Sequence, residues 1–150
     1  MKQLGLIFLL LPLVTSCDTP SKADLDSEVK RLCAIDGGIK VYETVKLPVE
    51  KFNQFGEVII PSKQDTKPTD EFYYEWDVSQ LKQGKPENGE ADLARSHFKL
   101  YRIIDRKLIG ESVAYTRRGG DISGPWHPSH FTCPLDSGLS VLQKSVFIRN

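Results

Sequence analysis

The stretch RSHFKLYRIIDRKLIGESVAYTR, residues 95–117, decides the fold. It contains two runs rich in β-branched and aromatic residues, 95–104 and 108–117, separated by three charged residues. Runs of this composition joined by a short polar connection are typical of a hairpin of two antiparallel strands. The sequence therefore predicts an antiparallel pair of strands in this part of the chain.

Strand signals continue on both sides of the hairpin. Some segments alternate apolar and polar side chains with a period of two, as half-buried strands do, and others are short apolar runs. Polar, glycine-bearing segments predict loops at 79–92 and 118–138. A helical turn is expected just before the last strand. The predicted strands are 39–47, 57–60, 71–78 and 145–149.

Residues 21–36 carry the signals of one amphipathic helix. Ser21 can cap its N-terminus, and Asp24, three residues later, completes a capping-box pattern. Gly37 and Gly38 end the helix, because glycine adopts the left-handed conformation after a helix end at little cost. An apolar stripe at helical spacing consists of Leu25, Val29, Leu32 and Cys33.

One helix followed by five or six mostly antiparallel strands predicts an α+β fold, with the N-terminal helix packed on one face of the sheet. Residues 22–150 are numerous enough to form a single globular domain with its own hydrophobic core. The sequence has neither internal repeats nor a strong compositional bias. We therefore expect one α+β domain over these residues.

The N-terminus carries a targeting signal. Lys2 precedes an apolar run at residues 4–14, which is shorter than the roughly 20 residues that a membrane-spanning helix needs. The sequence VTSC at residues 14–17 resembles the lipobox of bacterial lipoproteins. In that family the cysteine receives a diacylglycerol, the signal peptide is cut before it, and the new amino group is acylated. An ordinary cleaved signal with a chance cysteine is the alternative.

The resemblance implies that residues 1–16 are a cleaved signal peptide, that Cys17 carries lipid, and that residues 17–21 form a lipidated tether. Membrane lipid would then be the partner of Cys17, and the protein would face the periplasm from the bacterial cell envelope. Asp18 resembles the signal that retains enteric lipoproteins at the inner membrane. Two or three acyl chains hold a protein firmly on a bilayer without making it cross.

The charge balance argues against a nucleic-acid partner. The whole chain has 20 basic and 20 acidic side chains, and removal of residues 1–16 would take away one basic side chain, Lys2. Proteins that bind nucleic acid usually present a strongly basic surface. A nearly neutral protein of the cell envelope is therefore not expected to bind nucleic acid.

The chain has three cysteines. With Cys17 assigned to lipid, Cys33 and Cys133 form an even pair in an oxidising compartment, where disulfides persist. A bridge that closes a loop of about 100 residues stabilises a fold by roughly 4 to 5 kcal/mol in the chain-entropy model. Because Cys33 lies on the apolar stripe of the helix, we expect a structural disulfide between the two.

The stretch GPWHPSHFTCP, residues 124–134, concentrates side chains of the kinds that bind metals. His127, His130 and the cysteine of this stretch suit zinc or copper, and three ligands would leave an open coordination position. Prolines, however, break any helix that would align them, and a disulfide sulfur is not a thiolate ligand. The preferred interpretation is a rigid loop in which Trp126 and Phe131 pack over the disulfide, and no cofactor is expected.

Two further polar patterns have a structural and a functional interpretation. The RRGGD sequence at residues 117–121 can bind an anion through glycine N–H groups and arginine side chains. Two glycines and an aspartate also form a plain turn in which Asp121 bonds to its own backbone, and the turn is preferred. Glu43 falls on the apolar side of its alternating segment, so pairing with a cation such as Arg102 or Arg117 is expected.

No catalytic arrangement is recognisable in the sequence. The GES sequence at residues 110–112 lacks the second glycine that a nucleophile elbow requires. No serine, cysteine or threonine has a recognisable base near it, although such partners can be distant in sequence. An enzyme is therefore not expected.

The stretches CAIDGG (33–38), KVYETV (40–45) and GPWHPSHFTCP are similar to stretches of small proteobacterial lipoproteins, a likeness that implies no activity. The leading hypothesis is a binding module for an envelope partner, either an exclusion factor or an inhibitor of a wall-degrading enzyme. The alternatives are a metal-binding protein that uses His127 and His130, and a passive structural lipoprotein. The candidate partner-binding residues, chosen as anchors on a loop held by the disulfide, are Arg118, Asp121, Trp126, His127 and His130.

Overall fold

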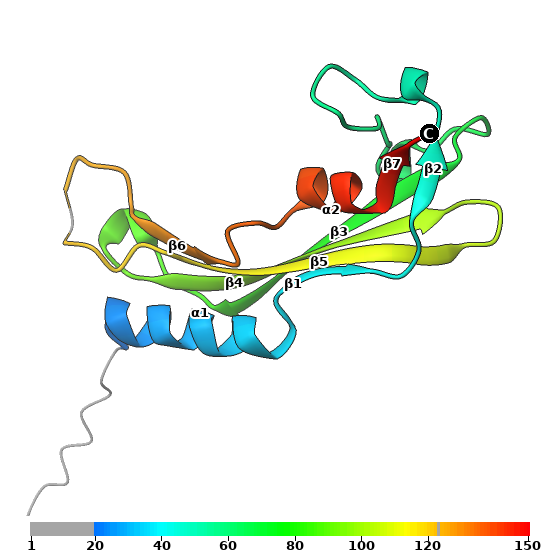
Figure 1. The fold of residues 1–150 in the computed structure, drawn as a ribbon. Coiled ribbons are helices and arrows are strands. Elements are labelled where there is room, and N and C mark those ends of the chain that lie inside the picture. Colours follow the sequence, from blue (N-terminus) through cyan, green and yellow to red (C-terminus); the bar gives the residue numbers. More distant parts are fainter. Residues whose placement is uncertain (1–19, 123) are drawn as a thin grey trace, which may run out of the picture.

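Figure 1 shows the protein in a computed structural model that describes residues 20–122 and 124–150. The proposed signal peptide, Cys17 and Asp18 lie outside these residues. The described chain forms two α-helices and a mostly antiparallel five-stranded sheet, so the predicted α+β fold is confirmed. The helices and strands are, in chain order, α1 (Lys22–Asp36), β1 (Gly38–Val41), β2 (Val45–Leu47), β3 (Phe72–Lys82), β4 (Asp92–Arg102), β5 (Lys107–Arg118), β6 (His130–Cys133), α2 (Leu139–Val146) and β7 (Phe147–Arg149).

The five-stranded sheet is built around β5. Its strands lie in the order β1, β5, β4, β3, and β6 also pairs with β5. Because β1 pairs with residues 110–113 and β6 with residues 115–118, these two short strands share one edge of β5. All of these pairings are antiparallel. A separate parallel pair, β2 with β7, stands over one end of the sheet (Figure 1).

The hairpin predicted from residues 95–117 is confirmed as β4 and β5. The two strands pair from Asp92 opposite Arg118 to Arg102 opposite Lys107, so both are slightly longer than predicted. Strand β5 has neighbours on both edges, and both helices pack against it. Most of its residues are buried for this reason.

Helix α1 packs on one face of the sheet, against β5 and β6 (Figure 1). Ser21 and Asp24 form the predicted capping box at its start. The helix ends at Gly37 as predicted. This residue is extended, with φ −66°, so the prediction that it adopts the left-handed conformation is wrong. A positive φ of 113° occurs at Gly38 instead. Close packing explains Gly37, since a Cβ on it would lie 2.7 Å from the Cys33 carbonyl oxygen.

A disulfide joins Cys33 near the end of α1 to Cys133 at the end of β6, as predicted. The two cysteines are 100 positions apart in the sequence, so the bridge closes most of the chain into one loop. Beside it, α1 covers a small apolar cluster of the sheet. The buried members of that cluster are Val29, Leu93, Val113 and Tyr115.

The opposite face of the sheet is covered at its other end. Helix α2 lies there, where only a helical turn was predicted, together with β2, β7 and the segment 48–61 (Figure 1). These elements and the sheet enclose the larger apolar core. Its buried members are Leu47, Val58, Ile60, Phe72, Leu100, Ile109, Leu142, Val146 and Phe147.

The strand predicted at residues 39–47 is in fact two strands, β1 and β2, which belong to different sheets. Glu43 lies at the break between them. Its carboxylate accepts hydrogen bonds from Lys107 and Arg102, so the expected pairing with Arg102 is confirmed. These donors, Lys107 first, hold the pKa of Glu43 below its ordinary value. The bonds tie the chain to the start of β5 at the point where it leaves the first sheet.

Other predictions of strands and loops are wrong as well. Residues 57–60 do not form a strand, because Val58 makes only an isolated bridge, to Phe52. Strand β3 extends four residues beyond the predicted range of 71–78 into a segment predicted as a loop. The long loop predicted at 118–138 contains β6, which pairs with the part of the β5 edge that β1 leaves open.

Candidate partner-binding site

Arg117, near the end of β5, organises the candidate site. Its side chain is only 2% exposed and lies between α1 and the loop 119–129. The Nε atom donates to the Asp26 carboxylate of α1 at 2.8 Å. The Nη1 atom donates to the Gly119 carbonyl at 2.7 Å and to the Ser129 hydroxyl at 2.8 Å. One buried guanidinium therefore fastens both ends of the loop to the helix.

This role of Arg117 differs from the two that the sequence suggested. Arg117 does not pair with Glu43, and its guanidinium is directed into the protein, where it bonds to the helix and the loop. The alternation of β5 contains the signal that was missed. By register Arg117 shares a face with Val113 and Tyr115, the face that α1 covers, so an inward orientation was predictable.

Asp121 closes the base of the loop. Its carboxylate accepts hydrogen bonds from Lys22 Nζ at 2.6 Å and from the Ser129 backbone N–H at 2.7 Å. These donors, Lys22 first, hold the pKa of Asp121 well below its ordinary range. Gly119 and Gly120 turn the chain here with φ values of 77° and 80°. These positive φ values agree with the preferred interpretation of the RRGGD sequence, a turn, and among the described residues the partners of Asp121 are Lys22 and Ser129.

Arg118 and His130 lie opposite each other on β5 and β6. Nη2 of Arg118 donates to the Asp92 carboxylate at 2.6 Å. The Asp92 side chain is almost completely buried, whereas that of Arg118 is 62% exposed. Arg118 therefore neutralises a buried acid and still presents part of its guanidinium beside the exposed His130.

Trp126 and His127 lie on the outer part of the loop, and both are exposed. The Trp126 ring lies against Gly124, where a Cβ would come within 2.2 Å of the ring. The expectation that Trp126 packs over the disulfide is therefore wrong. Phe131 does lie there, half-buried in the cluster that includes both cysteines. The five candidate residues are thus divided among the loop base, the loop tip and the sheet.

The metal-binding alternative lacks one of its three ligands. Cys133 is bonded to Cys33 and offers no thiolate. In residues 20–122 and 124–150, no group of three or more His, Cys, Asp or Glu side chains is placed to hold a metal ion. His127 and His130 would have to bind a metal as an exposed pair.

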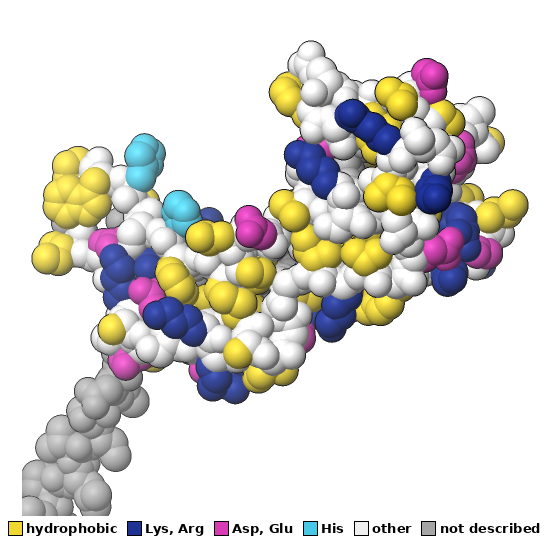
Figure 2. All heavy atoms as spheres, viewed as in Figure 1, with side chains coloured by type: hydrophobic (Ala, Val, Ile, Leu, Met, Phe, Trp, Pro, Cys, Tyr) yellow, Lys and Arg dark blue, Asp and Glu magenta, His cyan; other side chains and the backbone are white. Residues whose placement is uncertain are grey.

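Between the loop 119–129 and α2, part of one sheet face is uncovered, and Figure 2 shows the molecule hollowed between its two ends. Trp76 stacks on Phe98 there with ring centroids 5.6 Å apart, and its Nε1 donates to the Ser96 hydroxyl at 3.0 Å. The alternation in EFYYEWDV, residues 71–78, puts Trp76 on the same face as Phe72 and Val78, but the sequence could not show that this part of the face stays open. By strand register, the open face includes Trp76, Val78, Ser96, Thr116, Arg118, His130 and Thr132.

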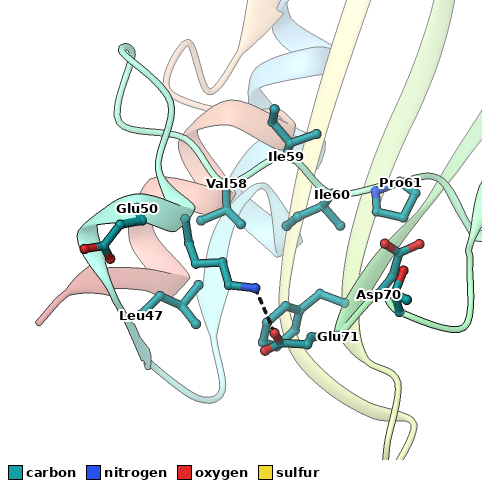
Figure 3. A pocket seen from close by; sticks show the side chains of 11 residues that line it. Leu47, Glu50, Val58, Ile59, Ile60, Pro61, Asp70 and Glu71 are labelled. Atoms are coloured by element: carbon teal, nitrogen blue, oxygen red, sulfur yellow. Dashed lines mark hydrogen bonds and ion pairs between the residues drawn. The ribbon is translucent and has the colours of Figure 1, made fainter.

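A pocket of about 260 Å³ lies near the other end of the sheet (Figure 3). Side chains of the larger core form its inner wall, and charged side chains surround its opening. Lys51 Nζ donates to the Glu71 carboxylate at 3.0 Å, with both side chains more than half exposed. Such a pocket can accept a small apolar group. The apolar residues that line it include Leu47, Val58, Ile60 and Phe72.

A network of paired polar groups lies on the sheet face that α1 partly covers. His97 Nε2 is 2.8 Å from Glu111 Oε2, and the Tyr42 hydroxyl donates to the same carboxylate at 2.5 Å. Burial tends to raise the pKa of Glu111, but the hydrogen bonds from Tyr42 and His97 hold it below its ordinary value. On the opposite face of β5, the hydroxyl of the next residue, Ser112, is buried and accepts from the Gly138 N–H at 2.9 Å. The bonds to Glu111 link β4 and the residue after β1 to β5.

The candidate site thus consists of a loop with a fixed base, its exposed tip and an adjoining open sheet face. Within the described part of the chain, neither helix has the length and hydrophobicity that crossing a membrane requires. Comparisons with models of known families, with curated proteins and with solved structures find no match to this chain.

Proposed function

We propose that this protein is a lipid-anchored protein of the bacterial cell envelope, and that it binds another envelope protein in the hollow between the loop 119–129 and α2. The observation that carries the proposal is a fixed loop beside an open sheet face. Arg117 and Asp121 hold the base of the loop, while Trp126 on the loop and Trp76 on the sheet are exposed. Binding, and not catalysis, is the role that this arrangement supports.

The fixed loop is suited to binding for two physical reasons. Exposed tryptophan and arginine side chains are frequent anchors of protein interfaces. A surface already held in its binding shape loses less conformational entropy when a partner arrives. Here the disulfide and the bonds of Arg117 supply that rigidity. An exclusion factor or an inhibitor of a wall-degrading enzyme, which acts by occupying its partner, would use such a surface.

The proposed anchor would bring this surface close to a membrane. Lys22, the first residue of α1, bonds to Asp121 in the loop base. Cys17 precedes Lys22 by five positions, and a chain of that length spans at most about 18 Å when extended. A lipid on Cys17 would therefore hold the loop near the bilayer surface, in the periplasm. Asp18 favours the inner membrane as that surface.

Site-specific photo-crosslinking in intact cells tests the proposed role. A photoreactive amino acid replaces His130, which lies on the open face, in the full-length chain. We expect it to capture one envelope protein, which mass spectrometry identifies. The same amino acid at Ile104, 90% exposed at the turn of the β4–β5 hairpin, is the matched control and is expected to capture none.

The affinity for the captured protein then tests the surface. Trp76→Ala and Trp126→Ala should each weaken binding at least about tenfold, because anchor tryptophans at interfaces are often worth about 2 kcal/mol. Ile104→Ala should leave the Kd unchanged. If both tryptophan variants bind like the wild type, the proposed surface is wrong. If position 130 captures no protein at all, a passive structural lipoprotein becomes the better explanation.

The anchor is tested separately. Mass spectrometry of the chain extracted from membranes should show that residues 1–16 are absent and that Cys17 carries acyl chains. Cys17→Ala should prevent both changes. A mature chain without lipid would overturn the anchor and leave the binding surface to be judged by the crosslinking alone.

A further inference from the structure

Strand β3 forms an open edge of the five-stranded sheet. The chain itself covers only the beginning of this edge, where the Tyr74 N–H donates to the Pro61 carbonyl at 3.1 Å and Ser62 bridges to Tyr74. At the far end the register with β4 shifts between Gln80 and Lys82. An irregularity of this kind bends a strand and ends regular pairing. The stretch between these two limits is free to pair.

The backbone of this stretch directs its hydrogen-bonding groups outward at every second residue. The Tyr74 N–H points away from β4, so the alternation along a strand directs the N–H and C=O groups of Trp76, Val78 and Gln80 outward as well. Among the backbone groups of residues 20–122 and 124–150, none bonds to this edge beyond Tyr74. An unpaired edge is a template for another strand.

One face of the free edge lacks protecting side chains. Natural sheets often shield their edges with charged side chains, especially lysine, or with proline. Residues 75–81, EWDVSQL, contain neither lysine nor proline, and their two charged residues, Glu75 and Asp77, lie on the face opposite Trp76 and Val78. Trp76 is 61% exposed and Val78 is 50% exposed, and both lie on the same face of the sheet. The edge is therefore apolar on one face and unpaired along its backbone.

We propose that this edge pairs with β3 of a second copy of the chain, antiparallel, about a two-fold axis at Val78. Two-fold symmetry is the commonest arrangement of homo-oligomers. Val78 is the midpoint of the free stretch 76–80. With the axis there, the pairing uses only this stretch in both copies and stops before the covered Tyr74 and the irregularity at Lys82. Trp76 then lies opposite Gln80 of the second copy. Residues with outward N–H groups face one another, as hydrogen-bonded antiparallel pairs require.

Charge favours this register over the neighbouring one. With the axis at Val78, Asp77 lies opposite Ser79 of the second copy, so each carboxylate faces a hydroxyl and not another charge. The Ser79 hydroxyl already donates to Asp77 of its own chain at 3.0 Å. An axis at Asp77 would place two carboxylates directly opposite each other, which is destabilising. A second copy therefore fits the free edge in length and in charge.

The dimer does not depend on the lipid anchor or on the partner proposed for the hollow. It would join two five-stranded sheets into one continuous sheet. Because the two-fold axis runs perpendicular to that sheet, the open faces of both copies would lie on the same side.

Cysteine crosslinking of the full-length chain in isolated membranes tests the register. Val78→Cys should give a disulfide-linked dimer on a non-reducing gel, since the two Val78 positions meet at the axis. Chains with Trp76→Cys and chains with Gln80→Cys should link to each other when they are produced together. Ile104→Cys, at an exposed turn, measures random collision and should link at least about tenfold less.

A proline variant tests the backbone pairing independently. Val78→Pro removes an N–H that points outward, so the ladder between β3 and β4 is preserved. Sedimentation of the full-length chain in detergent should show a dimer for the wild type and at least about tenfold weaker association for Val78→Pro. A monomeric wild type, or Val78→Cys that links no better than Ile104→Cys, overturns the proposal. Linkage of Cys at position 78 to a different protein also overturns it, in favour of an extended segment of that protein as the occupant.

Discussion

The two faces of the five-stranded sheet are held by different forces. On the face under α2, nine buried apolar residues form one continuous cluster. On the face under α1, the cluster has only four buried apolar residues. There the disulfide and the buried Arg117 fasten the helix to the sheet. Apolar contacts mainly hold α2 on its face of the sheet. The disulfide and the hydrogen bonds of Arg117 mainly hold α1 on the other face.

The sequence of α1 explains this difference. The helix has 15 residues but buries only Leu25 and Val29. Burial of two aliphatic side chains contributes roughly 3 to 6 kcal/mol, and the entropy of ordering the helix opposes it. Covalent and ionic bonds supplement this small contribution. Because such bonds have direction, they also hold the base of the loop at Gly119 and Ser129 in place, which apolar contacts alone would not do.

Removal of an apolar contact under α2 should have the largest effect on stability. Leu142→Ala should lower the free energy of unfolding by about 4 kcal/mol, because Leu142 is fully buried and the cavity left behind collapses only partly. Urea denaturation measures the loss. Leu135→Ala, at a highly exposed position just before α2, should change it by less than about 0.5 kcal/mol. In Leu142→Ala, the rate of hydrogen exchange at the Gly119 N–H in the loop base should rise only by the amount that the loss of global stability predicts.

Removal of the Arg117 side chain under α1 should lower the global stability less than Leu142→Ala does. It should loosen the loop base more. Arg117→Ala should lower the free energy of unfolding by about 3 kcal/mol, since it leaves the Asp26 carboxylate, the buried Gly119 carbonyl and the partly buried Ser129 hydroxyl without their donor. Here the Gly119 N–H, which bonds to the Ser129 carbonyl, should exchange faster than the global stability predicts.

Arg31→Ala provides the matched control for Arg117→Ala. Arg31 pairs with Glu28 on the exposed side of α1, and such a pair contributes less than about 1 kcal/mol. If Leu142→Ala and Arg117→Ala accelerate exchange at the same amides by the same factor, the two faces respond as one unit and the contrast drawn between them fails.

The parts of the fold that the sequence predicts are those with local signals. Helix α1 has a capping box and an apolar stripe within one segment, and the β4–β5 hairpin has two runs rich in β-branched and aromatic residues beside a short turn. Strand β6 has no such signal. It is a strand because β1 leaves part of the β5 edge open, a fact that depends on pairing between distant segments. The division of residues 39–47 likewise depends on Arg102 and Lys107, far along the chain.

The candidate site follows the same rule. The disulfide was predictable because it followed from the number of cysteines and the compartment expected from the N-terminal sequence, and neither requires geometry. The partners of Arg118 and Asp121 were not, because Asp92 lies 26 positions from Arg118, and Lys22 lies 99 positions from Asp121. The sequence indicated that these side chains belong to the loop predicted at 118–138, the candidate partner-binding loop. It could not show that Asp121 closes the loop while Trp126 is exposed.

The smallest of the three effects should be an acid-dependent loosening of the loop base. Hydrogen bonds from Lys22 and then Ser129 hold the pKa of Asp121 well below its ordinary range. A carboxylate whose pKa is lowered by folding stabilises the fold above its ordinary pKa of about 4, and this contribution is lost as the pH falls toward the lower value. Asp121→Asn should therefore be less stable than the wild type at pH 7. The difference in urea midpoint should shrink as the pH falls below about 4.

Asp105→Asn distinguishes a local effect of acid from a general one. Arg102 lowers the pKa of Asp105 to about 2, so this variant should show an acid dependence of the same sign. Asp105 lies at the hairpin turn, however, and has no bond to the loop base. Only Asp121→Asn should accelerate hydrogen exchange at the Ser129 N–H at neutral pH, because only Asp121 accepts that bond. Equal acceleration in both variants would mean that carboxylate loss weakens the whole fold, and the loop base would then not be a separately held unit of the α1 face.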